Sequence, residues 1–151
     1  MRTRLLSLLG ILVAVLPLSG CFGISLFGYT ATNPRECLIR AMYFESNRSS
    51  EEGMLAVGTV VMNRLAAPGF PKTICGVVGQ KNQFADGVLN RPMTERASLA
   101  RASSVADSIL AGARHPACTG AMFFHTSGLR FPYDNMHYVL VAGGNAFYAK
   151  Y

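Results

Sequence analysis

The chain has 151 residues, half of them hydrophobic and 15% charged, and its formal net charge is +6. This composition excludes a disordered or collagen-like protein, because enough apolar side chains are present to offset the conformational entropy lost on folding. The length suits one domain rather than two. The basic residues are scattered, so we expect most of them on solvated surfaces.

The N-terminus has the pattern of a secretory signal. Arg2 and Arg4 precede an apolar run over residues 5–18, which is shorter than the roughly 20 residues that a membrane-spanning helix needs. The run ends in Leu18-Ser19-Gly20-Cys21, which resembles a bacterial lipobox with Cys21 as the lipidation site; the alternative is a signal peptide in which this cysteine is incidental. The predicted divisions are a lipoprotein signal peptide over 1–20, a lipidated tether over 21–32 and one folded domain over 33–151.

This N-terminus also predicts where the protein resides. An exported protein with acyl chains on Cys21 is a membrane-anchored lipoprotein of the bacterial envelope, because each buried methylene contributes about 0.8 kcal/mol to anchoring. Phe22 in place of Asp after the lipidated cysteine favours the outer membrane in a Gram-negative host. Export argues against a nucleic acid partner, and the mildly basic balance suits a polyanionic polymer of the envelope.

The first two helices carry clear start signals. Asn33 can cap a helix in which Pro34 takes the first position and Glu36 reaches back three residues. Ser49 is the predicted cap of a second helix, with Glu52 closing the capping box. The apolar positions of both helices recur at helical spacing and predict the core, and they are Leu38, Ile39, Met42, Tyr43, Leu55, Val57, Val60, Val61 and Leu65.

The second helix should pack closely and end early. Gly53 and Gly58 permit close approach at some cost in helix propensity, and Pro68-Gly69 terminates the helix. Beyond it, the sequence predicts a short helical turn over 74–78, an irregular surface loop over 80–92 and a third helix over 94–112.

The C-terminal part has a different amino-acid composition. Residues 121–126 and 136–142 are rich in aromatic and aliphatic side chains, and turn-forming residues separate them, so we predict that they pair as a β-hairpin. Residues 143–148 are expected to form a turn followed by aromatic packing. The predicted fold class is therefore α+β, mainly α-helical, with a small C-terminal β-hairpin.

Cysteine and histidine usage limits the options for metal and redox chemistry. Besides Cys21 the chain has Cys37, Cys75 and Cys118, which predicts one disulfide and one free or buried thiol, with the pairing left open. No Cys-x-x-Cys motif occurs, and the histidines at 115, 125 and 137 lie outside any His-Glu-x-x-His helix, which argues against zinc. We expect neither a metal nor another cofactor.

Glu45 is the residue that points to chemistry. It follows Tyr43 and Phe44 at the expected end of the first helix, and aromatic surroundings desolvate a carboxyl group and raise its pKa. A carboxyl that stays protonated near neutral pH can donate a proton to a glycosidic oxygen as a general acid. The alternative is a solvated or capping glutamate.

Residues 37–148 resemble the SleB-type cell-wall hydrolase family, which includes spore-cortex-lytic enzymes. No single stretch is specific, but the ordered set is. The matching stretches, in chain order, are Ala41-Met42-Tyr43-Phe44-Glu45, Glu52-Gly53, Ala56-Val57, Val60-Val61-Met62-Asn63-Arg64, Phe70-Pro71, Ile74-Cys75-Gly76-Val77-Val78, Gln80, Gln83-Phe84, Gly120-Ala121, Phe124-His125, Gly144-Asn145 and Phe147-Tyr148.

The resemblance implies a lysozyme-like or transglycosylase-like fold and cleavage of peptidoglycan glycan strands. It also implies that Glu45 is the catalytic acid. In lytic transglycosylases one carboxyl suffices, since it protonates the bridging oxygen and then takes the proton of the muramic C6 hydroxyl. The sequence offers no evident second carboxylate of the kind that ordinary two-carboxylate glycosidases use.

The chain departs from the family at two places in this region. Relatives commonly read Glu-Ala-Arg-Gly-Glu where this chain reads Glu45-Ser46-Asn47-Arg48-Ser49, so Ser49 replaces a second glutamate. Ala85 follows Gln83-Phe84 where relatives often carry serine. The departure at Ser49 favours, as an alternative, a catalytically impaired envelope lipoprotein that binds peptidoglycan without cutting it.

Further residues are predicted to contact the glycan. Asn63 and Arg64 end the second helix and either bind substrate or buttress the site, and Gln83, Phe84 and His125 are candidates for the sugar groove. Tyr43, Phe124 and Tyr133 have rings that can stack on sugars, although core packing is the default for the first two. A cell-wall amidase or peptidase is a weaker alternative, because no metal set or Cys–His nucleophile pattern is evident.

Overall fold

The computed structural model of the protein describes residues 30–46, 48 and 50–151. The predicted signal peptide, Cys21 with its lipid, nearly all of the tether and Ser49 lie outside the described residues. The helices are α1 (Pro34–Glu45), α2 (Glu51–Ala66), α3 (Ile74–Val78) and α4 (Arg96–Leu110), and a short 3₁₀ turn spans Pro116–Cys118. The strands β1 (Phe123–Thr126), β2 (Met136–Ala142) and β3 (Asn145–Lys150) follow at the C-terminus.

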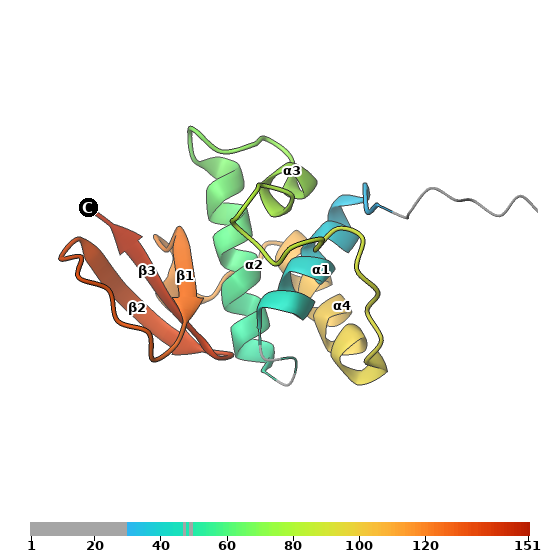
Figure 1. Ribbon diagram of the computed structural model, residues 1–151. Coiled ribbons are helices and arrows are strands. Elements are labelled where there is room, and N and C mark those ends of the chain that lie inside the picture. Colours follow the sequence, from blue (N-terminus) through green and yellow to red (C-terminus); the bar gives the residue numbers. More distant parts are fainter. Residues whose placement is uncertain (1–29, 47, 49) are drawn as a thin grey trace, which may run out of the picture.

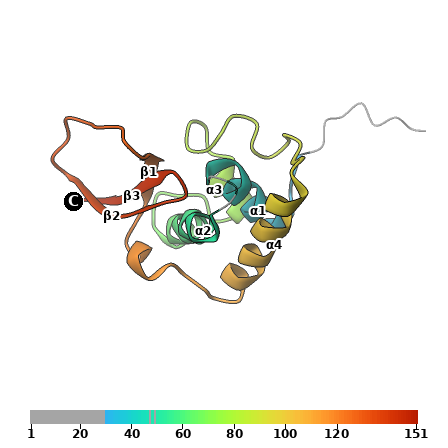
Figure 2. The same ribbon diagram turned by 90° about the horizontal axis from the view of Figure 1, so that it is seen from below.

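Helix α2 stands at the centre of the molecule (Figure 1), with the other helices on one side and the sheet on the other. The view along α2 in Figure 2 shows the same separation. The fully buried side chains of α2 include Met54, Val57, Val60 and Val61. They pack with buried side chains of α1 and α4 in one core. Because α2 contacts both halves, it fixes where the sheet sits relative to α1.

The capping signals place α1 correctly and α2 with a shift of one residue. The Asn33 side chain accepts a hydrogen bond from the N–H of Arg35, and Pro34 opens α1 as predicted. At α2 the predicted cap, Ser49, is wrong, because Ser50 occupies that position and its Oγ accepts from the N–H of Gly53 at 2.9 Å. Serine is a favourable N-cap residue, and Ser50 lies three residues before Gly53, the spacing that lets its hydroxyl accept from that N–H.

Two glycines of α2 permit close packing, as the sequence predicts. A Cβ on Gly53 would lie 2.4 Å from the Cα of Gly143 in the β2–β3 turn, and one on Gly58 would lie 2.1 Å from Cδ1 of Ile109 in α4. Gly53 therefore lets the backbone of α2 touch the backbone of the sheet, and Gly58 lets α4 approach α2.

The strand pairing differs from the predicted hairpin. The sheet is antiparallel with the order β1-β3-β2, so β1 and β2 each pair with β3 and not with one another. Gly143 and Gly144 have φ of 56° and 81°, and such a two-residue turn with positive φ at both positions joins adjacent antiparallel strands. The hairpin is therefore β2–β3, and the residues predicted to follow as aromatic packing form the central strand.

One disulfide joins Cys37 of α1 to Cys75 of α3, and Cys118 is a buried free thiol. This confirms the predicted count and resolves the pairing that the sequence left open. The bridge fixes α3 against α1 at the point where the chain enters the loop over residues 79–92. That loop is irregular, as predicted, but it is not wholly superficial, since Phe84 and Val88 are buried.

Candidate active site

Glu45 is the last residue of α1, and a local hydrogen-bond pattern ends the helix there. Ser46 leaves the helical conformation with φ −92° and ψ 161°, and both its N–H and its hydroxyl donate to the carbonyl of Met42, at 3.2 and 2.9 Å. Tyr43, two residues before Glu45, points inward and is buried. Because α1 ends here, the carboxyl group of Glu45 lies at the edge of the core, in the wall of a groove.

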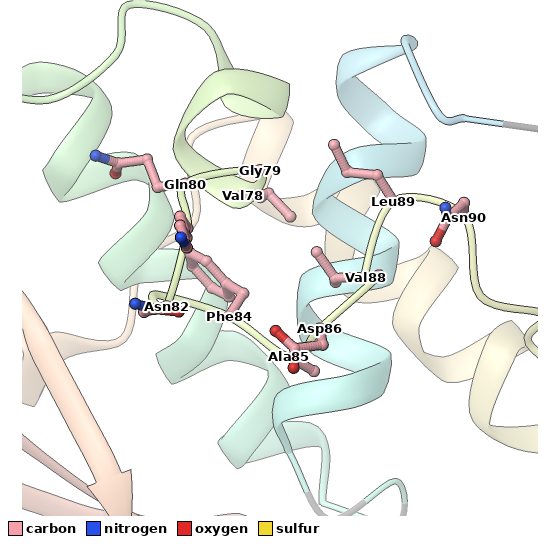
Figure 3. Close-up of a pocket in the computed structure, with 12 residues that line it drawn as sticks. Val78, Gly79, Gln80, Asn82, Phe84, Ala85, Asp86, Val88, Leu89 and Asn90 are labelled. Atoms are coloured by element: carbon pink, nitrogen blue, oxygen red, sulfur yellow. The ribbon is translucent and has the colours of Figure 1, made fainter.

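The loop over residues 79–92 covers this end of α1. Figure 3 shows the loop crossing from α3 over α1 and carrying Ala85 beside the C-terminal part of that helix. The loop is anchored by the N–H of Ala31, which donates to Leu89 O at 2.8 Å, and by Nη1 of Arg40, which donates to Arg91 O at 2.7 Å. A pocket of about 190 Å³ lies against the loop, and Asn82 and Phe84 line both this pocket and the groove at Glu45.

The carboxyl of Glu45 has an unequal environment at its two oxygens. The N–H of Ala85 donates to Oε1 at 2.5 Å, whereas Oε2 accepts no hydrogen bond from the described part of the chain. Burial raises the pKa of this carboxyl above its ordinary value, and the Ala85 N–H and the charges of Arg64 and Arg91 oppose the rise without cancelling it. This confirms the desolvation that the flanking aromatic residues predicted.

A groove of about 330 Å³ opens beside Glu45. Five of the residues predicted to act on or contact the glycan meet in its walls, namely Glu45, Gln83, Phe84, Phe124 and His125, together with Asn82, Thr126, Leu129 and Asn145. They come from the end of α1, from the loop over 79–92, from β1 and the residues after it, and from the start of β3. Glu45 is the only acidic side chain among these lining residues.

Arg64 supports the groove from behind instead of lining it. Its side chain is 3% exposed, its Nε donates to Met122 O at 2.7 Å, and its guanidinium lies 5.4–5.8 Å from the ring centres of Phe70, Phe84 and Phe123. Burial lowers its pKa to about 10, so the group stays charged at neutral pH. Of the two roles that the sequence left open for Arg64, substrate contact or support of the site, this buried position among three aromatic rings favours support.

Asn63 has a similar supporting role. Its Nδ2 donates to the carbonyls of Cys118 and Ala121, both at 2.8 Å, and the residue does not line the groove. The two bonds tie α2 to the chain that leads into β1. Of the two readings that the sequence left open for this residue, the structure favours the buttress.

His125 lines the groove with a ring held on both sides. Its Nδ1 lies 2.8 Å from Thr126 O, and its Nε2 lies 2.8 Å from the hydroxyl of Tyr138. Because a carbonyl only accepts, Nδ1 carries the proton in the neutral ring, and Nε2 accepts from the Tyr138 hydroxyl. The imidazole is therefore fixed in orientation at the rim.

Sequence reasoning missed two groups that hold Glu45. Asn145, at the start of β3, donates from Nδ2 to the main-chain carbonyl of Glu45 at 2.6 Å and also lines the groove. The second group is the backbone N–H of Ala85, which no side-chain pattern can reveal. The turn signal Gly143-Gly144 could have pointed to Asn145, since a residue directly after such a turn has a defined position.

The other histidines lie elsewhere. His115 is buried, its ring Nδ1 accepts from the N–H of Ala117, and Nε2 lies 3.5 Å from Glu52, while the ring of His137 packs on Tyr151. Among the described residues, no three or more His, Cys, Asp or Glu side chains gather in a way that could hold a metal ion. Within those same residues, no helix has the length and apolar character needed to cross a membrane.

Comparison with known proteins matches this architecture. The chain is 33% identical over 73 residues to the spore cortex-lytic enzyme of Bacillus subtilis (strain 168), a match that covers 46% of this chain and 24% of that protein. It therefore spans about a quarter of the length of this curated relative.

Two solved structures share the fold. The catalytic domain of Bacillus cereus SleB aligns with a TM-score of 0.59 at 20% identity, covering 79% of this chain and 91% of that one. The catalytic domain of the germination-specific lytic transglycosylase SleB from Bacillus anthracis aligns with a TM-score of 0.61 at 22% identity, covering 78% and 95%. A family model for cell wall hydrolases matches residues 48–148. The chain belongs to the cell wall hydrolase family.

Proposed function

We propose that this protein cleaves the glycan strands of peptidoglycan, as a lytic transglycosylase or a muramidase, with Glu45 as general acid and then general base. The observation that carries the proposal is a single half-buried carboxyl, with a raised pKa, in the wall of a groove that holds no other acid. The matched family range begins at residue 48, so the role of Glu45 rests on this geometry. Relatives named as a spore cortex-lytic enzyme and a lytic transglycosylase support the substrate class.

The hydrogen bond from Ala85 determines which oxygen carries the proton. Because an N–H cannot accept, Oε1 remains an acceptor, and the proton of the neutral acid resides on Oε2. This proton passes to the oxygen between two sugars, and the C1–O bond breaks. The resulting carboxylate keeps the Ala85 hydrogen bond and is stabilised by the nearby charges of Arg64 and Arg91.

The second half of the reaction needs no second carboxylate. The C6 hydroxyl of the muramyl residue attacks its own C1, and Glu45 accepts the hydroxyl proton, which regenerates the acid and leaves a 1,6-anhydro sugar. If water attacks in place of O6, the same proton transfer yields a reducing end. A groove with one acid accommodates either route, whereas a two-carboxylate mechanism lacks its partner among the lining residues.

A second candidate function is binding of peptidoglycan without cleavage. Ser49 stands where relatives commonly carry a second glutamate, and this favours a protein that keeps the groove but has lost turnover. The enzyme remains the better supported function, because Glu45 keeps its place in the groove and Ala85 contributes only its backbone N–H to it, which any residue other than proline could supply.

The products released from purified sacculi distinguish these functions. We expect the full chain to release muropeptides, and mass spectrometry of their ends separates anhydro from reducing sugars. A protein that pellets with sacculi and releases nothing would establish the binder. Release of stem peptides from intact glycan would establish an amidase or peptidase.

The cellular setting is part of the proposal. A lipid on Cys21 would hold the domain at the membrane surface with peptidoglycan within reach, and the outer membrane is favoured if the host is Gram-negative. The basic balance of the chain suits a polymer that bears lactyl and peptide carboxylates.

The pH profile should report the ionisation of Glu45. A general acid must be protonated, so kcat/KM should fall as the pH rises through the raised pKa of Glu45. The charge of Arg91 lowers that pKa, so Arg91→Gln should move this alkaline limb to higher pH. Arg96→Gln, which removes an exposed charge at the start of α4, is the matched control. An alkaline limb at the same pH in Arg91→Gln and wild type would contradict the assignment.

A further inference from the structure

A further, smaller cavity lies on the sheet, beyond His125. The long connection between β1 and β2 forms a wide loop that stands out from the strands (Figure 2), and a slot of about 80 Å³ forms between Phe131, Tyr133, Met136, Tyr148 and Lys150. Phe131 and Tyr133 are 43% and 62% exposed. Aromatic rings left this open on a folded domain indicate a surface that binds something.

The slot is adjacent to the groove, with His125 between them. His125 lines the groove, and its ring centre lies 4.8 Å from that of Phe131 and 5.6 Å from that of Tyr148, both of which line the slot. A polymer lying in the groove at Glu45 and continuing past His125 therefore meets the slot next.

The shape of the slot suits a flat ring. Phe131 and Tyr133 are stacked nearly parallel, at 10°, with their centres 6.3 Å apart, and because both rings are exposed the pair leaves an open aromatic face for a ligand. Sugar rings carry C–H groups on their faces, and these bind to the negative face of an aromatic ring. At about 80 Å³, the slot is far smaller than the 300–1,000 Å³ of pockets that enclose drug-sized ligands, so it can hold part of one sugar ring against its aromatic side chains and does not enclose the sugar.

Lys150 gives the slot a charge. Its Nζ lies 5.1 Å from the ring centre of Phe123 and 6.0 Å from those of Tyr133 and Tyr148. Across residues 30–46, 48 and 50–151, no carboxylate forms an ion pair with it. An ammonium held among rings and unneutralised by the protein is suited to an anionic ligand.

We infer that this slot is a distal subsite that selects a carboxylate-bearing sugar of the glycan strand, a muramyl residue, over N-acetylglucosamine. Phe131 and Tyr133 stack on the sugar ring, and Lys150 pairs with the lactyl or stem-peptide carboxylate. The inference rests on the proposed function in that peptidoglycan is the substrate. It adds a residue, Lys150, that binds the carboxylate of a sugar unit at a distance from the bond being cleaved.

Binding measurements test the subsite separately from catalysis. The probes are a tetrasaccharide of alternating N-acetylglucosamine and N-acetylmuramic acid and, as the ligand without carboxylates, a tetramer of N-acetylglucosamine. Calorimetry is carried out on the full chain carrying Glu45→Gln, so that neither probe is consumed. Lys150→Gln should weaken binding of the muramyl probe about tenfold, as for the loss of one charge-assisted contact, and leave the other probe unchanged. Tyr133→Ala should weaken both.

Matched variants complete the design. Lys72→Gln removes the same charge from the exposed α2–α3 connection and should change neither affinity. Equal effects of Lys150→Gln on both probes, or none on either, would overturn the subsite, as would a Tyr133→Ala variant that binds like its parent. If wild type releases no muropeptides from sacculi but the affinity pattern holds, cleavage fails as the proposed function while the subsite stands.

Discussion

Glu45→Gln should reduce the release of muropeptides about 10³-fold, within the range by which general acid–base catalysis accelerates reactions. The substitution keeps the shape of the side chain, and the amide oxygen of glutamine can still accept the hydrogen bond from Ala85 that Oε1 receives at 2.5 Å. What is lost is the proton on the other oxygen. Mass spectrometry of products from sacculi measures the effect.

The same variant should fold at least as well as wild type at neutral pH. Burial raises the pKa of Glu45 above its ordinary value of 4.5, so the folded state holds the proton more tightly than the unfolded state does. The stability associated with that proton is present below the unfolded pKa and is lost as the pH rises through the folded pKa. Glutamine never ionises, so its advantage in thermal melts should grow over that pH window and vanish in acid.

Glu51→Gln is the control for this experiment. It removes a carboxyl from the exposed first turn of α2 and should leave product release unchanged. Equal release by Glu45→Gln and wild type would remove Glu45 from the mechanism, and a Glu45→Gln protein that melts far below wild type at neutral pH would contradict the raised pKa.

The elements that the sequence predicts well are those with local signals. Asn33 and Pro34 mark the start of α1 to the residue, and the aromatic pair before Glu45 predicts a desolvated carboxyl. These two predictions depend only on residues within one or two helical turns of each other, because helix geometry alone determines which of those residues are in contact.

The strand order could not be read in the same way. The aromatic and aliphatic residues of segments 121–126 and 136–142 predict that both are extended, but they do not say which edges pair. The two-residue turn at Gly143 and Gly144 makes β3 the partner of β2, and β1 then takes the other edge of β3, with Phe124 opposite Phe147.

The residues that support Glu45 and the aromatic wall of the groove depend on the same long-range arrangement. The sequence left open whether Arg64 binds substrate or buttresses the site, because its position at the end of a helix does not show what surrounds it. In the structure, Phe70, Phe84 and Phe123 surround it, from three separate parts of the chain. Asn145 reaches Glu45 across 100 residues of sequence, so its role appears only once the sheet is docked on α2.

That docking depends on one glycine, and Gly53→Ala should destabilise the domain by about 3 kcal/mol, the cost of strong overpacking. The added Cβ would lie 2.4 Å from the Cα and 2.9 Å from the N of Gly143. Both are backbone atoms of a tight turn, so no side chain can rotate away and the turn itself must move. Urea denaturation followed by circular dichroism measures the loss.

Gly58→Ala is the matched comparison, since it makes the same change in the same helix. Its Cβ would meet the Cδ1 of Ile109 at 2.1 Å and the Sδ of Met42 at 3.1 Å, and these are the ends of flexible side chains. Replacing a helical glycine by alanine also contributes about 1 kcal/mol of helix propensity. We therefore expect a clearly smaller loss at Gly58, and the reverse order would show that the α2–sheet contact yields more easily than its backbone geometry implies.

The Gly53 substitution should also affect the active site. Asn145 lies two residues after Gly143, and its Nδ2 holds the carbonyl of Glu45 at 2.6 Å. A turn displaced from α2 carries Asn145 with it, so Gly53→Ala should lower product release even at temperatures where the protein remains folded, whereas Gly58→Ala should not. Full activity in folded Gly53→Ala protein would mean that Glu45 keeps its position without the sheet, through Ala85 alone.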